Sequence, residues 1–244
     1  MHTTHVWNLF DLHWKKIILG LLIGCGLLNT ADAQTVGYFR KHQEFYDDKP
    51  IHYGFLFALP VTRFRLVHDD SFLTQDTTNR ITAPVTVGFR FGFVMNGYLN
   101  DHWDIRTTPS VSLYNRAVEY EYGSGKKRRE LREATWIEIP LLFKYKSQRR
   151  MNSRMYMLAG ATFGFETNVR KRQLPGSDRL NAKSADLTID YGFGFEQFLA
   201  YTKFSPELRF SHGIVNLYRT NDPNSTASIR RLTSHTVTLY LMFE

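Results

Sequence analysis

The fold is decided by the stretch Val85-Thr-Val-Gly-Phe-Arg-Phe-Gly-Phe-Val-Met-Asn96. Large apolar residues occupy every second position from Val85 to Met95, and the residues between them are small or polar, apart from Val94. Alternation with a period of two is the signature of a β-strand, because successive side chains point to opposite faces. The stretch therefore predicts a strand with one apolar and one polar face.

Seven further segments show the same tendency to alternate. In Ala185–Phe198, five large apolar residues alternate with carboxylates, glycines and a threonine. All eight segments reach the ~9–11 residues that a tilted membrane strand needs, and all exceed the ~5–6 of an ordinary soluble strand. The eight predicted strands are Ile51–Phe64, Ile81–Tyr98, Trp103–Tyr122, Glu133–Lys146, Met155–Thr167, Ala185–Phe198, Thr202–Ile214 and His235–Phe243.

The connections between these strands alternate in length. Outer-membrane barrels have long outer loops and short periplasmic turns, whereas a soluble sandwich, which alternation alone also allows, has no reason to sort its loops. We therefore predict an all-β fold, an eight-stranded antiparallel transmembrane up-and-down β-barrel of the bacterial outer membrane. The long loops are Arg65–Arg80, Gly123–Arg132, Asn168–Ser184 and Val215–Ser234, and the short links are Leu99–His102, Ser147–Arg154 and Leu199–Tyr201.

The composition agrees with a membrane barrel. The chain has 244 residues, of which 43% are hydrophobic and 15% aromatic, and its mean hydropathy is −0.34. That value is too polar for a bundle of membrane helices. It suits strands of which only alternate residues meet lipid.

The first 33 residues resemble a signal peptide, with the apolar run Ile17–Leu28 and cleavage between Ala33 and Gln34. An uncleaved anchor and a lipoprotein-type cleavage before Cys25 are the alternatives. We expect three parts: a signal peptide over 1–33, a periplasmic lead-in over 34–50 and the barrel over 51–244. The lead-in is expected to be disordered, the alternative being a surface that contacts a partner.

The formal net charge is +8 and the pI about 9.5. Nucleic acid is not an expected partner, because an exported protein rarely meets it and no recognition motif is present. The expected partners are instead outer-membrane lipid and lipopolysaccharide, attracted by basic outer loops. These loops contain Lys126, Lys127, Arg128, Arg129, Arg170, Lys171, Arg172, Arg230 and Arg231.

Charges on the inward face of the predicted strands balance in sign. An eight-stranded barrel is only wide enough to be filled by side chains, and buried charges must be paired. We therefore predict a salt-bridge network that plugs the lumen. Its members are Arg90, Arg106, Arg116, Lys144 and Arg209, with Glu138, Glu166, Asp190, Glu196 and Glu207.

No catalytic, cofactor or metal site is predicted. Ser211 and His212 are adjacent on a strand and point to opposite faces, so they cannot act together as nucleophile and base. Asp190 and Glu196 share a face but lie six residues, or ~20 Å, apart along the strand. His68, Asp69 and Asp70 are interpreted as solvated loop charge, the alternative being a cation site.

Two further stretches resemble the PorT (also called SprT) family of Bacteroidetes. They are Asp186-Leu-Thr-Ile-Asp-Tyr-Gly-Phe-Gly-Phe-Glu196 and Lys203-Phe-Ser-Pro-Glu-Leu-Arg-Phe-Ser-His-Gly-Ile-Val-Asn216. His52-Tyr-Gly-Phe55 and Trp136-Ile-Glu-Ile-Pro-Leu-Leu-Phe-Lys144 are similar to the same family, although the latter is generic among Bacteroidetes barrels.

The resemblance implies a component of the type IX secretion system, which exports cargo carrying a sorting domain and in some species serves gliding motility. It implies other secretion components as partners and carries over no catalytic residues. Two alternatives stay open: a general eight-stranded barrel for adhesion or envelope integrity, and a lipid-modifying enzyme.

Overall fold

The computed structural model describes residues 41–68, 78–122, 127–167, 183–218 and 229–244. Residues Lys41–Glu244 form one compact unit. Among the described residues, no helix is long and apolar enough to cross a membrane. The predicted cleavage site at Ala33 and Gln34 lies outside the described ranges.

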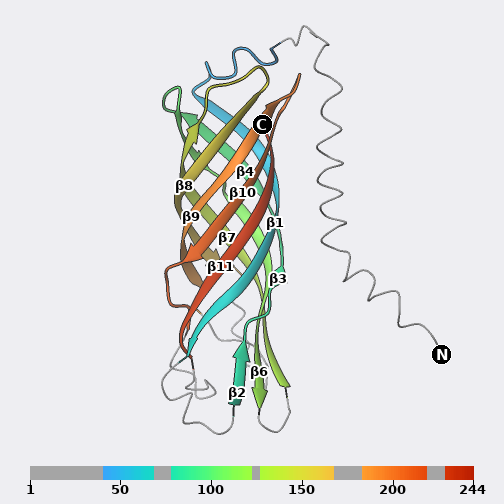
Figure 1. Cartoon of the computed structure of the whole chain (residues 1–244), viewed down its shortest axis with the longest axis vertical. Coiled ribbons are helices and arrows are strands. Elements are labelled where there is room, and N and C mark those ends of the chain that lie inside the picture. The colour runs from blue at the N-terminus through green and yellow to red at the C-terminus, as the bar shows by residue number, and fades with distance from the viewer. Residues whose placement is uncertain (1–40, 69–77, 123–126, 168–182, 219–228) are drawn as a thin grey trace, which may run out of the picture. The chain divides into compact units, whose positions relative to one another are not determined.

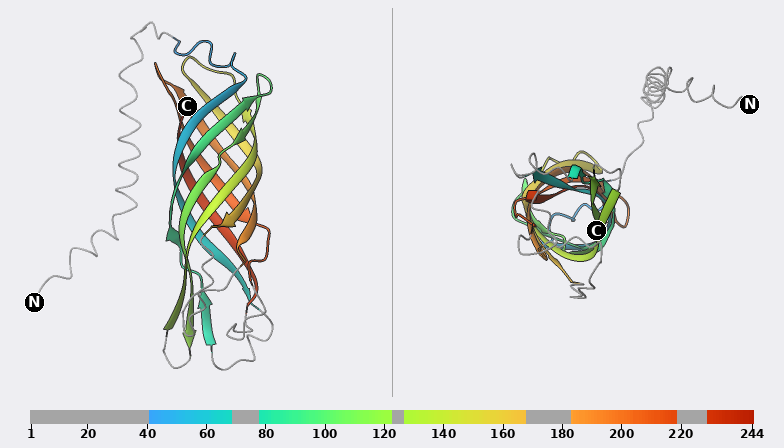
Figure 2. Two further views of the ribbon diagram at one scale, coloured as in Figure 1. Left: turned by 180° about the vertical axis from the view of Figure 1, so that it is seen from behind. Right: turned by 90° about the horizontal axis from the view of Figure 1, so that it is seen from below.

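The described part of the chain forms eleven β-strands in one sheet that closes on itself (Figures 1 and 2). The strands are β1 (Ile51–His68), β2 (Thr78–Thr82), β3 (Thr86–Val87), β4 (Phe89–Tyr98), β5 (Trp103–Thr107), β6 (Ser110–Tyr122), β7 (Lys127–Lys146), β8 (Ser153–Glu166), β9 (Ala185–Phe198), β10 (Lys203–Gly213) and β11 (Ile229–Phe243).

The eleven strands make eight antiparallel traverses. The second traverse consists of β2, β3 and β4, and the third of β5 and β6. Each traverse pairs with the next, and β1 pairs with β11 from Phe55–Phe243 to His68–Ile229 to close the ring. The predicted eight-stranded up-and-down barrel is confirmed.

Prolines break the second and third traverses. Pro84 lies between β2 and β3, and Pro109 lies between β5 and β6. Proline has no backbone N–H to donate to a neighbouring strand. The inter-strand hydrogen bonding is therefore interrupted at these two positions. The continuous strands predicted over Ile81–Tyr98 and Trp103–Tyr122 are wrong at these points.

Three predicted loops are too long, and Arg65–Arg80 is wrong at both ends because β1 continues to His68 and β2 begins at Thr78. The loop Gly123–Arg132 is wrong because β7 already begins at Lys127, so Lys127, Arg128 and Arg129 belong to a strand. Lys127 lies opposite Glu121, and Arg129 lies opposite Glu119. Residues 127–132 show no apolar alternation, so the period-two pattern did not reveal this part of the strand.

The loop Val215–Ser234 is wrong for the same kind of reason, since β11 begins at Ile229 and includes Arg230 and Arg231. The prediction of basic outer loops is thereby corrected for residues 127–129 and 230–231. Lys126 and the trio Arg170, Lys171 and Arg172 lie outside the described residues.

The predicted faces are confirmed. Val85, Phe93 and Met95 point outward and are 58%, 71% and 40% exposed, whereas Arg90 and Val94 point inward and are buried. At a rise of ~3.3 Å and a tilt of ~45°, the positions from Val85 to Met95 span about 23 Å of height, close to the ~25 Å apolar band of membrane barrels. The sheet thus turns its apolar face outward and its polar face inward.

The short turns lie at one end of the barrel, together with the start of β1 and Glu244, the last residue; we name this the N-terminal end (Figure 1). The opposite end, where β2 and the β6–β7 hairpin project, is named the loop end.

Candidate functional site in the barrel interior

Charged side chains fill the interior because the inward positions of β4 to β10 carry them. All ten residues predicted for the lumen network lie on inward positions. Nine of them are buried, namely Arg90, Arg106, Arg116, Lys144, Glu166, Asp190, Glu196, Glu207 and Arg209. The side chain of Glu138 is 12% exposed.

Glu196 of β9 is the centre of a cluster near the N-terminal end. Its carboxylate lies 2.5 Å from Lys144 Nζ, 3.1 Å from Lys203 Nζ and 3.5 Å from Arg106 Nη2. Arg154 forms a fourth ion pair with it. One carboxylate thus serves four cations, and neutrality requires further acids nearby.

Those acids surround Arg106. Its guanidinium lies 3.1 Å from Glu207 and 3.3 Å from Glu244, and it sits over the ring of Tyr156 at 5.1 Å from the centroid. The hydroxyl of Tyr156 donates to Glu207 at 2.9 Å. Glu207 also holds Arg209 at 2.6 Å. The cluster therefore joins side chains of β5, β7, β8, β9 and β10.

Five members of this cluster were absent from the predicted set: Asp104, Lys146, Arg154, Lys203 and Glu244. Asp104 lies 2.7 Å from Lys146 and 3.4 Å from Lys144. Each of the five shares the parity of an inward residue two or four positions away, as Asp104 does with Arg106. The alternation therefore indicates that these five residues point inward. They were missed because they lie near the ends of the predicted strands.

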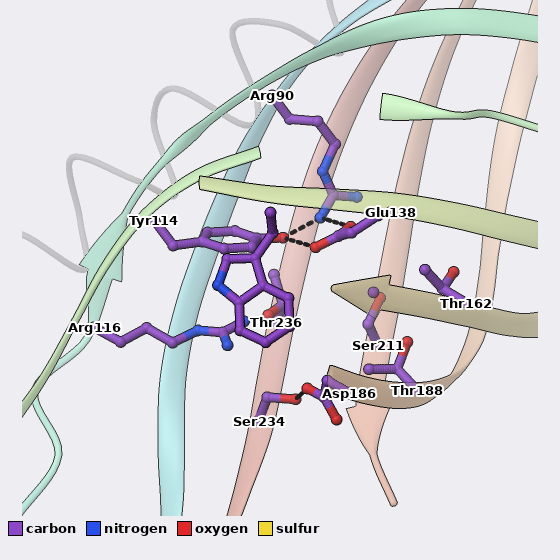
Figure 3. Close-up of a pocket in the computed structure, with 12 residues that line it drawn as sticks. Arg90, Tyr114, Arg116, Glu138, Thr162, Asp186, Thr188, Ser211, Ser234 and Thr236 are labelled. Carbon is purple, nitrogen blue, oxygen red and sulfur yellow. Dashed lines mark hydrogen bonds and ion pairs between the residues drawn. The ribbon is translucent and has the colours of Figure 1, made fainter. Parts of the chain in front are cut away.

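A second cluster occupies the middle of the barrel. Arg90 forms an ion pair of 2.5 Å with Glu138, and the hydroxyl of Tyr114 donates to Glu138 at 2.6 Å. Arg90 also donates to the hydroxyls of Tyr114 and Tyr240. Figure 3 shows the Arg90, Tyr114 and Glu138 side chains converging from three different strands.

Toward the loop end, this cluster lines a cavity of about 20 Å³. Arg116 reaches it from β6, stacked against Tyr114 at 4.5 Å from the ring centroid and donating to Thr62 at 3.1 Å. Asp186 accepts from Ser234 on the other side (Figure 3). A space of this size holds about one water molecule, so the interior here is packed.

Residues Lys41–Pro50, which we name the cap, cover the N-terminal end. The ring of Tyr46 stacks on His52 with centroids 3.8 Å apart. Its hydroxyl donates to Glu244 at 2.8 Å and accepts from Lys203 at 2.6 Å. Burial and the charge of Glu244 raise the pKa of Tyr46 well above its ordinary value.

The rest of the cap is held by the turn between β7 and β8. Arg149 donates to the carbonyl oxygens of His42 and Gln43, and Asp47 forms an ion pair of 3.0 Å with Arg154. The disordered lead-in expected for these residues is therefore wrong over 41–50. Beside the cap lies a polar cavity of about 250 Å³ lined by Asp47, Asp101, His102, Lys146, Arg149 and Arg154, among others.

The residues considered for catalysis are kept apart. Ser211 lines the internal cavity, whereas His212 points outward and meets Tyr191 and His235. Asp190 and Glu196 contact different partners. In the described ranges no three histidine, cysteine or acidic side chains gather as metal ligands would. Asp69 and Asp70 lie outside those ranges.

A closed barrel with an apolar outer face and a charged interior defines the class of outer-membrane β-barrels. The family described as "Outer membrane protein beta-barrel domain" matches residues 33–219, and the chain belongs to this family. The protein is accordingly located in the bacterial outer membrane. A search of curated proteins finds no match.

Solved barrels are similar at low identity. The outer membrane protein OprG of Pseudomonas aeruginosa is 13% identical with a TM-score of 0.40, over 78% of this chain and 92% of that one. Neisserial surface protein A is 9% identical with a TM-score of 0.40, over 80% and 98%. The attachment invasion locus protein Ail of Yersinia pestis is 10% identical with a TM-score of 0.34, over 80% and 98%.

Proposed function

We propose that the chain is a non-conducting, non-enzymatic barrel with a structural role in the outer membrane, in envelope integrity or adhesion. The observation that carries this is the ion-paired interior centred on Glu196 and Arg106, both with fully buried side chains. A solute crossing the barrel would have to separate such pairs, and breaking a buried pair costs ~3–5 kcal/mol. The cap adds a second obstruction at the N-terminal end.

The orientation proposed for the barrel places the N-terminal end in the periplasm. The predicted signal peptide delivers the chain to that side, and the short turns lie at the same end of the barrel. Short periplasmic turns and long outer loops are the usual arrangement. The loop end then faces outward, and the cap lies in the periplasm.

A lipid-modifying enzyme is less well supported. Such an enzyme needs a nucleophile within hydrogen-bond reach of a base. Ser211 faces the interior and His212 the outside, so this pair does not meet the requirement.

The structural role is tested in a deletion strain of the native host. Loss of the barrel is expected to raise sensitivity to detergent and to large antibiotics, or to reduce adhesion, and the wild-type gene should restore both. A deletion strain that matches its parent in all these assays argues against the proposal.

A second candidate function is a component of the type IX secretion system. The segment Pro206–Gly213 favours it, since this is the most specific part of the resemblance to the PorT family. Two of its residues, Glu207 and Arg209, belong to the buried cluster. The cap and its adjoining cavity of about 250 Å³ would offer periplasmic components a polar surface.

The secretion role has its own test. Deletion should abolish export of cargo that carries the sorting domain, and in a gliding species it should stop gliding. Quantification of the secreted fraction by mass spectrometry measures the effect. Normal export in the deletion strain eliminates this candidate while leaving the structural role in place.

A further inference from the structure

On three neighbouring strands, the outward face changes from apolar to basic at the same position in the register. The last apolar row toward the loop end consists of Val61, Val237 and Phe210 on β1, β11 and β10. The next row consists of Arg63, His235 and His212 on the same three strands. Val67 and Ile214 are exposed beyond it, so the Arg63 row marks where basic side chains begin and the outward face stops being uniformly apolar.

Two more arginines extend this basic row away from the apolar band. Arg65 is exposed on β1, two residues beyond Arg63, and Arg231 is exposed on β11. Arg231 donates to the carbonyl of Ile214 at 3.0 Å. Among the described residues, neither Arg63 nor Arg65 has an ion pair, and every carboxylate on β1, β9, β10 and β11 has inward parity.

The opposite wall of the barrel is different. At the loop end of the β6–β7 hairpin, Glu119 lies across from Arg129 and Glu121 lies across from Lys127. The backbone register there thus sets basic positions opposite acidic ones. Among the described residues of β1, β10 and β11, by contrast, the register sets no acidic position opposite the basic row.

The two histidines of the row are joined in a hydrogen-bonded chain. His212 Nδ1 lies 2.7 Å from His235 Nδ1, and His212 Nε2 lies 3.0 Å from the hydroxyl of Tyr191. When Tyr191 donates to His212, His212 donates in turn to His235, and the Nε2–H of His235 is left as a donor. The chain therefore fixes the His235 ring beside Arg63.

We propose that Arg63, Arg65 and His235 form a site for the phosphate headgroup of a glycolipid of the outer leaflet. Guanidinium groups suit phosphate oxygens through paired N–H donors. The acyl chains of such a lipid would lie against the apolar row of Val61, Val237 and Phe210, directly below the site. The inference rests on the proposed orientation, which puts the loop end in the outer leaflet.

The test uses the full chain purified in detergent and native mass spectrometry with two probes. They are bisphosphorylated lipid A and the same lipid A without its phosphates. The wild type should prefer the phosphorylated probe. Arg63→Gln with Arg65→Gln should weaken its binding about 30-fold, at ~1 kcal/mol for each basic residue. The control Lys49→Gln with Arg150→Gln removes two charges from exposed residues at the N-terminal end and should change nothing.

Unequal mobility of heated and unheated samples on a denaturing gel verifies that both variants are folded. Equal binding of the two probes by the wild type, or undiminished binding by the Arg63/Arg65 variant, overturns the proposal. So does full displacement of the lipid by millimolar inorganic phosphate, which would indicate a free-anion site. Lipid binding in detergent and the phenotypes of the deletion strain are measured separately. Failure of the lipid site is therefore distinguishable from failure of the proposed structural role.

Discussion

The ammonium of Lys144 lies 2.5 Å from the carboxylate of Glu196, and neither side chain has any exposed surface. Lys144 belongs to β7 and Glu196 to β9, so the pair reaches past the intervening strand β8. Charges so deep in a barrel cannot be stabilised by water and depend on one another. The interior is consequently a structural element in its own right.

Replacing Glu196 with Gln is expected to destabilise the barrel by ~3–5 kcal/mol, because the four cations around it lose their shared carboxylate. Denaturant unfolding in detergent, followed by tryptophan fluorescence, measures the change. Glu44→Gln makes the same chemical change at an exposed residue of the cap and should stay within ~0.5 kcal/mol of the wild type. Equal stability of the two variants would contradict the account.

Gly194→Ala is expected to destabilise the barrel by ~1–3 kcal/mol through overpacking. A Cβ at Gly194 would lie about 2.3 Å from the ring of Tyr156, whose hydroxyl donates to Glu207. Gly164→Ala is the matched control, since its Cβ would meet Trp136 at an ordinary 3.4 Å. Unfolding curves of the two variants should separate; coincident curves would show that Tyr156 moves freely and that the interior is not tightly packed.

Tyr46→Ala is expected to release the cap, because it removes the ring stacked on His52 and the hydrogen bonds to Glu244 and Lys203. At ~1 kcal/mol for each hydrogen bond, trypsin should cleave after Lys41, the first residue of the cap, about 30-fold faster. Phe45→Ala provides the control, since Phe45 is 75% exposed. If both variants are cleaved at the wild-type rate, the cap does not depend on Tyr46.

Attachment of the cap should weaken at high pH. Burial and Glu244 raise the pKa of seated Tyr46, whereas the phenol of a detached cap ionises near its ordinary value of ~10. The buried position favours the neutral phenol of Tyr46. Attachment of the cap is therefore at full strength below pH ~10 and declines as the pH rises above it. A spin label at Glu44→Cys should become more mobile between pH 9 and 11. Tyr46→Phe cannot ionise and should flatten this response; an identical response in both would contradict the assignment.

The strands and their faces were predictable because alternate residues of a barrel strand face lipid and the lumen, and their polarity differs accordingly. Ala185–Phe198 was predicted with the bounds of β9. The breaks at Pro84 and Pro109 were missed, since Pro60, Pro140 and Pro206 remain within strands and position decides the outcome. The first residues of β7, 127–132, were missed because they show no apolar alternation, whereas the end of β6 at Tyr122 was predicted.

The sequence predicted that charged side chains fill the interior, but it did not predict which of them form ion pairs with one another. Parity places Arg106 and Glu207 inside, yet which carboxylate meets which cation depends on the register of strands far apart in the chain. The cap could not be predicted at all. Tyr46 and Glu244 are 198 residues apart, and nothing in the local sequence of Lys41–Pro50 indicates that contact.

We propose above all that the charge-filled interior closes the barrel to ions and solutes. Reconstitution of the purified, heat-modifiable protein into planar lipid bilayers tests it most directly. We expect no stable conductance steps, because Arg106, Glu196 and Glu207 occupy the lumen as ion pairs. Reproducible channel openings by the wild-type protein would contradict the account.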